Sequence, residues 1–186
     1  MDADGLTATV RWETALTESD HAALSELLVA AFPEQPDVFT GRSWAWARKE
    51  ARLWLTDGTS RPVAHLAVER RLVDVGGAEI LVAGIGEVAV SPELHGRGVG
   101  AALMAEFRPR LRTVFAADFG FVQCGEGVLG FYRSVGWIPV PNVVRHLDPD
   151  DERTVREGVW PALIMPGRRT RTEWPDGLVD LRGLPW

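Results

Sequence analysis

The stretch AEILVAGIGEVAVSPELHGRGVGAALM, residues 78–104, decides the fold of this chain. Its first half is an apolar run typical of a buried strand, and its second half consists of good helix formers. Between them, Gly96, Gly98 and Gly100 stand at alternate positions around Arg97. A strand that ends in a glycine-rich turn and opens into a helix presents unpaired main-chain N–H groups at the positive end of the helix dipole. The stretch therefore predicts a phosphate-binding turn, to which Arg97 adds a charge.

Two other phosphate-binding patterns fit this stretch poorly. Gly96, Gly98 and Ala101 satisfy a loose G-x-G-x-x-A dinucleotide pattern, but the acidic residue expected at the end of the next strand is missing, because Asp118 lies before that strand. The chain also lacks the G-x-x-x-x-G-K-[ST] motif of nucleotide triphosphate sites. A plain tight turn is the remaining alternative, and three alternating glycines exceed what such a turn requires.

Strands outnumber helices on both sides of the stretch. Residues 8–15 have the pattern of a first strand, and a helix follows with Thr17 as its N-cap and Pro33 as its stop. Further strands are predicted over residues 51–57, 62–75, 78–90, 119–124 and 137–140, and further helices from the glycine turn to about residue 115 and over 127–136. This order predicts an α/β fold in which helices flank a mixed, largely antiparallel central sheet.

The composition limits the class of protein. With 186 residues, 46% of them hydrophobic and 25% charged, the chain is expected to form a single globular domain over residues 1–186. It has no apolar run of about 20 residues and no signal-peptide pattern, so a cytoplasmic location and no membrane contact are expected. The single cysteine, Cys124, and the absence of an H-E-x-x-H spacing predict no metal site. The net charge of −6 disfavours nucleic acid and suits a cationic small molecule.

The segment VAVSPELHGRGVGAALM, residues 88–104, resembles the acyl-CoA-binding motif of the GCN5-related N-acetyltransferases (GNAT), in which [QR]-x-x-G-x-[GA] opens a helix after a strand. His95 stands where that family usually has glutamine or arginine. A second segment, GFYRSVGW at residues 130–137, is similar to another motif of the family. The resemblance implies the GNAT fold and acetyl-CoA or a longer acyl-CoA as cofactor. It also implies the cofactor-binding residues, which are Val88, Ala89, Val90, His95, Gly96, Arg97, Gly98, Val99, Gly100 and Ala101.

Longer segments are similar to two branches of that superfamily. Residues 41–55, 63–94 and 171–183 resemble the nodulation N-acyltransferases, which place a fatty acyl group on the free amine of a chitin-oligosaccharide. Residues 63–72 and 128–137 are also similar to the aminoglycoside 2'-N-acetyltransferases. Both branches acylate a sugar amine, so the resemblance implies an N-acyltransferase that uses acetyl-CoA and an aminoglycoside-like or amino-sugar acceptor. A long-chain acyl donor and a non-catalytic acyl-CoA-binding module are the alternatives.

Three residues are candidates for the catalytic chemistry. The resemblance places Tyr132, the single tyrosine of the chain, near the thioester sulfur, where it would protonate the departing thiolate; an aromatic side chain that only packs is the alternative. Glu87 lies on the strand beside the thioester, but the glutamate of the aminoglycoside-acetylating proteins aligns on Gly86, and a shift of one residue reverses the face. A bulge in this glycine-interrupted strand would restore the direction, so a general base and a solvated edge carboxylate are equal alternatives for Glu87. His65 is either a second base or a core histidine.

The acceptor site is predicted from charge. Acidic side chains in a partly desolvated pocket favour a cationic amine, and Trp186 would add its carboxylate if the end of the chain folds back. The acceptor-binding candidates are Glu34, Asp37, Asp151, Glu152 and Trp186; an ordinary acidic surface with a frayed tail is the alternative. Trp44, Trp46 and Trp54 are expected in the core, with stacking on a sugar ring as the alternative. The small-molecule amine acceptor is the expected partner, and the alternatives for the assembly are a monomer and a homodimer.

Overall fold

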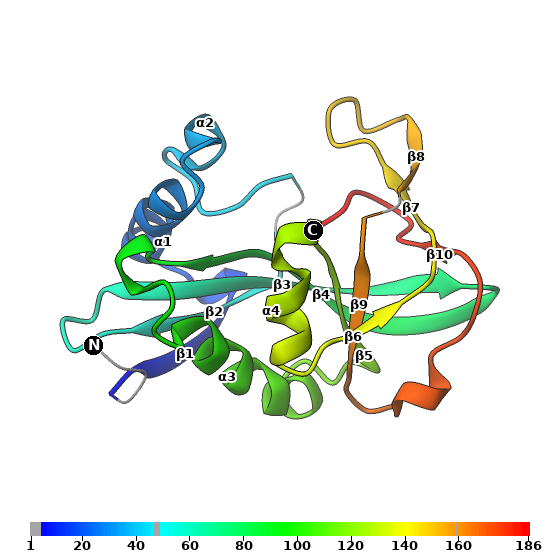
Figure 1. The fold of residues 1–186 in the computed structure, drawn as a ribbon. Coiled ribbons are helices and arrows are strands. Elements are labelled where there is room, and N and C mark those ends of the chain that lie inside the picture. Colours follow the sequence, from blue (N-terminus) through cyan, green and yellow to red (C-terminus); the bar gives the residue numbers. More distant parts are fainter. Residues whose placement is uncertain (1–4, 47–48, 159) are drawn as a thin grey trace. The chain divides into compact units, whose positions relative to one another are not determined.

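The computed structural model describes residues 5–46, 49–158 and 160–186. The chain divides into two compact units: the first takes in residues 1–69, 85–107 and 186, and the second takes in residues 70–84 and 108–185. Three elements contribute residues to both units, namely β3 (Pro62–Val75), β4 (Ala78–Val90) and α3 (Val99–Thr113) (Figure 1). The single domain expected from the length of the chain stays a prediction.

The first unit is built on an antiparallel set of strands. β1 (Thr7–Trp12) pairs with β2 (Ala51–Thr56), and β2 pairs with the first part of β3. The other elements of this unit are the 3-10 turn η1 (Glu13–Ala15), the helices α1 (Glu18–Ala31) and α2 (Pro36–Phe39), the last part of β4, the 3-10 turn η2 (Pro92–Leu94) and the start of α3.

The second unit contains the longer series of paired strands, in the order β6-β9-β5-β4-β3-β10-β7-β8. Its β4–β5 and β10–β7 pairs are parallel, whereas β5–β9, β6–β9, β7–β8 and β10–β3 are antiparallel. Its further elements are β5 (Phe119–Gln123), α4 (Glu126–Ser134), β6 (Ile138–Val140), β7 (Val144–Leu147), β8 (Val155–Gly158), β9 (Ala162–Pro166), the 3-10 turn η3 (Arg171–Glu173) and β10 (Val179–Asp180). The predicted α/β class with a mixed, largely antiparallel sheet is confirmed.

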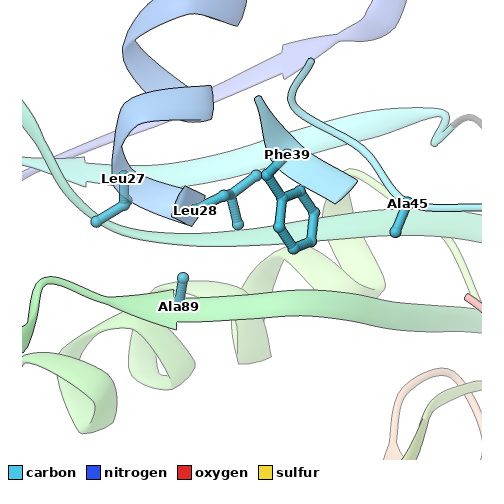
Figure 2. Packing of buried hydrophobic residues seen from close by; sticks show 5 residues of the cluster. All are labelled: Leu27, Leu28, Phe39, Ala45 and Ala89. Atoms are coloured by element: carbon cyan, nitrogen blue, oxygen red, sulfur yellow. The ribbon is translucent and has the colours of Figure 1, made fainter. Parts of the chain in front are cut away.

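Helix α1 begins where the sequence predicts. The Thr17 side chain accepts a hydrogen bond from the Asp20 amide, and the Asp20 carboxylate accepts one from the Thr17 amide, which completes a capping box. The buried side of the helix carries Leu27 and Leu28, which pack with Phe39, Ala45 and Ala89 in one hydrophobic cluster. Figure 2 shows this cluster between α1 and the end of β4, where it holds the segment around Ala45 close to the strand.

Strand β3 is covered on both faces within the first unit. Its residues from Val63 to Val68 are all fully buried, including His65. Because side chains alternate across a strand, the register of β2 against β3 puts His65 on the same face as Trp54 and Arg52. One face of this unit therefore carries a buried histidine and a buried arginine.

Most predicted elements are present at nearly the predicted bounds, whereas α2, β7, β8, β9 and β10 were not predicted. These five elements are short, at two to five residues, which leaves little room for a periodic pattern. Among the helices that the structure describes, none has the length and apolar character needed to cross a bilayer.

Candidate functional site

The glycine turn between β4 and α3 has the backbone conformation that glycine favours. Gly96 and Gly98 have φ of 75° and 80°, in the left-handed region, and a Cβ built on either residue would meet open space. His95 is exposed, and its Nε2–H donates to the Val90 carbonyl over 3.0 Å, which ties the turn back to the end of β4. The turn is thus ordered by its own contacts and open on its outer side.

The main-chain amides of this turn point to an anion site. Residues 96 to 98 are exposed, and Arg97 donates its amide to the Leu94 carbonyl over 3.3 Å. Within the described part of the chain, the amides of Gly96, Gly98, Val99, Gly100 and Ala101 donate to no protein acceptor. Because α3 opens at Val99, these amides lie at the positive end of its dipole. The arrangement can bind a phosphate group.

The cofactor-binding residues on β4 lie just before this turn. Ala89 is buried in the hydrophobic cluster, whereas Val88 and Val90 are half-buried. Ser91 then donates its amide to the Val63 carbonyl over 2.8 Å. The residues predicted to hold the acyl-CoA therefore all lie between Val88 and Ala101 in the first unit, and their role in binding stays a prediction.

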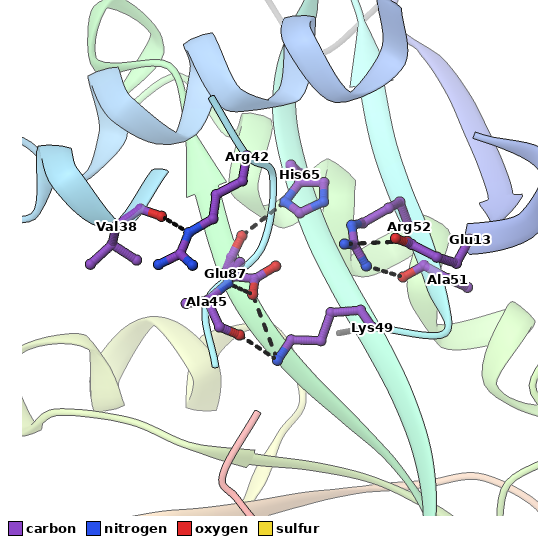
Figure 3. Close-up of polar contacts among 9 residues, drawn as sticks. All are labelled: Glu13, Val38, Arg42, Ala45, Lys49, Ala51, Arg52, His65 and Glu87. Atoms are coloured by element: carbon purple, nitrogen blue, oxygen red, sulfur yellow. Dashed lines mark hydrogen bonds and ion pairs between the residues drawn. The ribbon is translucent and has the colours of Figure 1, made fainter. Parts of the chain in front are cut away.

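Glu87 lies in β4 with a φ of 52°, which breaks the regular pleat of the strand at this residue. Its Oε1 accepts a hydrogen bond from the Ala45 amide over 2.7 Å and lies 3.6 Å from the Lys49 Nζ (Figure 3). Its Oε2 is buried and has no hydrogen-bond partner among the described residues. Burial raises the pKa of Glu87 above its ordinary value, against the lowering effect of Lys49. The carboxylate is buried rather than at a solvated edge, with one oxygen free.

His65 contacts the main chain of the same residue. Its Nδ1–H donates to the Glu87 carbonyl over 3.0 Å, and its Nε2 is buried without a partner among the described residues (Figure 3). Burial, with a further effect of Arg52, lowers the pKa of His65 to about 3. These contacts favour a structural role for His65, in which the neutral imidazole supports the backbone at Glu87. The alternative, that His65 is a second base, stays a prediction.

Sequence reasoning missed two buried cations beside Glu87. The Lys49 and Arg52 side chains are both fully buried, and Arg52 forms an ion pair with Glu13 at 3.3 Å (Figure 3). Burial lowers the pKa of Lys49, and Glu87 and Glu69 oppose this effect. In the sequence these residues belong to a charged run that is typical of a solvated surface, so no local signal marks them.

Trp186 lies against β4 at Gly86. It is buried, and a Cβ built on Gly86 would come within 2.6 Å of the Trp186 carbonyl carbon. The end of the chain is therefore packed rather than frayed, and position 86 has no room for the glutamate that the aminoglycoside-acetylating proteins carry there. The role of Trp186 in acceptor binding stays a prediction.

Replacing Gly86 by alanine is expected to lower the free energy of unfolding by about 1–3 kcal/mol, because the new methyl group overlaps main-chain atoms of Trp186 that cannot rotate away. Urea unfolding followed by tryptophan fluorescence measures the change. Gly127→Ala is the matched control, since a Cβ there meets nothing within 4 Å. Equal stability of Gly86→Ala and the control would contradict the observed packing of Trp186.

Tyr132 lies in α4 of the second unit. Its ring packs against Phe131 and Trp137, and the residue is buried. Burial raises the pKa of the Tyr132 phenol above its ordinary value, and Cys124 adds to the effect. A phenol that stays protonated fits the predicted acid, and this role stays a prediction.

The acidic acceptor candidates are divided between the units. Glu34 and Asp37 are exposed in the first unit, and Asp151 and Glu152 are exposed in the second. A hydrogen bond from the Thr154 hydroxyl, with bonds from main-chain amides, lowers the pKa of Asp151 to about 2. Asp151 thus stabilises its own turn, and acceptor binding by these four residues stays a prediction.

The three tryptophans with sugar stacking as an alternative role, Trp44, Trp46 and Trp54, differ in their contacts and exposure. Trp54 is buried, and its ring lies 5.6 Å from the Arg11 guanidinium carbon. Trp44 packs its ring against His21. Trp46, in contrast, is 50% exposed and has a φ of 50°. The expectation of a core position is wrong for Trp46, whereas the residue before it, Ala45, is buried in the hydrophobic cluster.

The sequence and the fold both match known proteins. The family model for nodulation protein A (NodA) matches residues 4–184. Nodulation protein A of Rhizobium leguminosarum bv. trifolii is 34% identical over 194 aligned residues that cover 94% of each chain. Its counterpart from R. leguminosarum bv. viciae is 35% identical over 191 residues, covering 92% of this chain and 93% of its own.

Solved structures with a similar fold include an N-acetyltransferase of the GNAT family. YhbS of Escherichia coli, solved in complex with CoA, has a TM-score of 0.62 at 18% identity, covering 95% of this chain and 91% of its own. E. coli ElaA has a TM-score of 0.59 at 19% identity, covering 86% and 97%. The chain therefore belongs to the nodulation protein A (NodA) family and is an N-acyltransferase built on the GNAT fold.

Proposed function

We propose that this protein transfers an acyl group from a coenzyme A thioester to the free amine of an amino-sugar acceptor. The observation that carries the proposal is the glycine turn at the start of α3, with five amides that have no acceptor among the described residues. Such a turn provides hydrogen bonds and a favourable dipole for the pyrophosphate of the donor, and its open outer side leaves room for it. Arg97, exposed in the same turn, adds a positive charge.

The family match favours an oligosaccharide acceptor over an aminoglycoside. The resemblance to the nodulation N-acyltransferases implies a chitin-oligosaccharide with one free amine, and the match to that family extends over almost the whole chain. Trp46 supports a sugar acceptor, because an exposed indole offers a flat apolar face for a sugar ring. It directly follows Ala45, whose amide holds the Glu87 carboxylate.

In the proposed reaction the amine nitrogen attacks the thioester carbonyl, the new C–N bond forms and the C–S bond breaks. The amine loses one proton and the thiolate gains one. Glu87 is the proposed base, since its Oε2 is free to accept a proton. Because the Glu87 side chain is 4% exposed, we assign the transfer to one bridging water between the amine and Oε2.

Acceptor-dependent release of thiol tests the proposal. Acetyl-, octanoyl- and palmitoyl-CoA are each offered with a chitin-oligosaccharide carrying one free amine and with an aminoglycoside, and mass spectrometry identifies the acylated product. The fully N-acetylated oligosaccharide is the matched control, because it lacks only the amine. Release with the amine and none with the control is expected. Binding of CoA without release for any pair would favour the non-catalytic module, and a rate that rises with chain length would identify a fatty acyl donor.

Replacing Gly98 by alanine is expected to weaken CoA binding at least tenfold. Alanine disfavours a φ of 80°, and a rotated turn loses at least one amide hydrogen bond to the pyrophosphate, each worth about 1.5–3 kcal/mol to a charged group. Isothermal titration calorimetry measures the change. Gly77→Ala is the control, because Gly77 also has a positive φ of 91° with open space around it but lies in the β3–β4 turn. Equal affinities of both variants would place the pyrophosphate elsewhere.

A further inference from the structure

The Lys49 side chain is held in the interior by contacts with Ala45 and Glu87. Its Nζ donates to the Ala45 carbonyl over 3.3 Å and lies 3.6 Å from the Glu87 Oε1. The Ala45 amide donates to the same Oε1 over 2.7 Å. Figure 3 shows the resulting arrangement, in which Ala45 contacts the ammonium with its carbonyl and the carboxylate with its amide.

The stability of the fold does not by itself explain the buried Lys49–Glu87 ion pair. Its Lys49 and Glu87 side chains are 0% and 4% exposed, and removing two charges from water costs free energy that their mutual attraction repays only with excellent geometry. Apolar residues of similar volume often serve a protein interior equally well or better. A buried ion pair in such a place is explained more readily by a requirement for the charged carboxylate.

The contacts on Glu87 are unequal. Both donors, the Ala45 amide and the Lys49 ammonium, lie at Oε1, whereas Oε2 is buried without a partner among the described residues. The carboxylate is thus anchored through one oxygen, which leaves the lone pairs of the other available.

We propose that Lys49 is a positioning residue that keeps the Glu87 carboxylate ionised and turned so that Oε2 receives the proton of the acceptor amine. This inference rests on the proposed function of Glu87 as the base. Lys49 acts through Glu87 and has no contact of its own with either substrate in this proposal.

Other charged groups near the Lys49–Glu87 pair also affect the pKa values of its two members. Arg52 on β2 and Glu69 on β3 interact with it electrostatically, and Glu13 pairs with Arg52. Among the described residues, the neutral His65 and the main-chain end of Trp186 at Gly86 are further neighbours. A Lys49 variant leaves the identity of each of these groups unchanged.

The sign of the effect follows from the groups around Glu87. Burial raises the pKa of Glu87, and the Lys49 charge lowers it. Lys49→Met removes the charge and keeps most of the volume, so Glu87 would be protonated up to a higher pH. Protonated Glu87 cannot accept a proton from the amine, so Lys49→Met would be inactive at a pH where the unmodified protein is active.

The test compares the pH dependence of kcat/KM for the unmodified protein, Lys49→Met and Lys49→Arg between about pH 5 and pH 9. In Lys49→Met the acid limb is expected to move up by about one pH unit or more, which is about a tenfold loss at the low end that disappears at high pH. Lys49→Arg, which keeps the charge, is expected to restore the limb. A uniform loss at every pH, with no moved limb, would show a merely structural role and overturn the proposal.

A second readout does not depend on turnover. Titration of the Glu87 carboxyl carbon by ¹³C NMR, assigned with Glu87→Gln, is expected to give a higher midpoint in Lys49→Met than in the unmodified protein. An unchanged midpoint would overturn the inference. If Lys49→Met does not fold, the same comparison with Lys49→Gln and Lys49→Arg decides it. Turnover of no amine by the unmodified protein would refute the proposed function, while the NMR midpoint still tests the link between Lys49 and Glu87.

Discussion

Glu87→Gln is expected to lower kcat for acceptor-dependent thiol release by about a hundred- to ten-thousand-fold, the usual contribution of a general base. Glutamine has nearly the same shape, and its carbonyl can still accept the Ala45 amide hydrogen bond at the place of Oε1. It cannot take a proton from the amine. Steady-state rates at saturating donor and acceptor measure the change, with calorimetry to establish that CoA binding stays within about twofold.

Asp57→Asn is the matched control for Glu87→Gln. Asp57 is also a buried carboxylate of the first unit, and it accepts hydrogen bonds from the Thr59 and Arg61 amides in the β2–β3 turn. This control is expected to keep its activity. A Glu87→Gln rate within about threefold of the unmodified protein would exclude a base at this position. Glu87→Gln alone removes the base and also breaks the ion pair of the buried Lys49. The double variant Lys49→Met/Glu87→Gln removes both charges, so it shows the loss of the base without the free-energy cost of a broken ion pair.

Glu13→Ala is expected to lower the free energy of unfolding by about 3–5 kcal/mol, the usual cost of removing one member of a buried ion pair. The Arg52 side chain is 0% exposed and lies 3.3 Å from the Glu13 carboxylate. The Glu13 side chain is 14% exposed, so it can reach water when Arg52 is absent. Arg52→Met is therefore expected to cost less than Glu13→Ala, although both changes break the same ion pair.

Urea unfolding with linear extrapolation measures these free energies. Glu157→Ala is the control, because the Arg145–Glu157 pair is exposed at 40% and 50%, and such pairs contribute at most about 1 kcal/mol. If Glu13→Ala and Glu157→Ala lower stability equally, the burial of Arg52 contributes nothing to the stability of the first unit.

Features that depend on neighbouring residues were predictable from the sequence. The capping box at Thr17, the β2–β3 hairpin and the turn from β4 into α3 each depend on a few adjacent residues, whose backbone preferences act wherever the segment lies. The glycines also predicted the turn, because Gly96 and Gly98 have the positive φ values that glycine favours, while phosphate binding by the turn stays a prediction. The class of fold followed from the order of these segments.

Features that depend on contacts between distant segments were decided by the tertiary structure. Lys49 and Arg52 look like surface charges in the sequence, yet they are buried because Glu87 and Glu13, far away in the chain, come to lie beside them. Position 87, rather than 86, carries the glutamate because Trp186 fills the space that a side chain at Gly86 would need. The sequence by itself determined most of the elements and the glycine turn between β4 and α3, since both follow from local backbone preferences. Only the tertiary structure decided which charges are buried together, because desolvation and Coulomb attraction depend on distances in space and not along the chain.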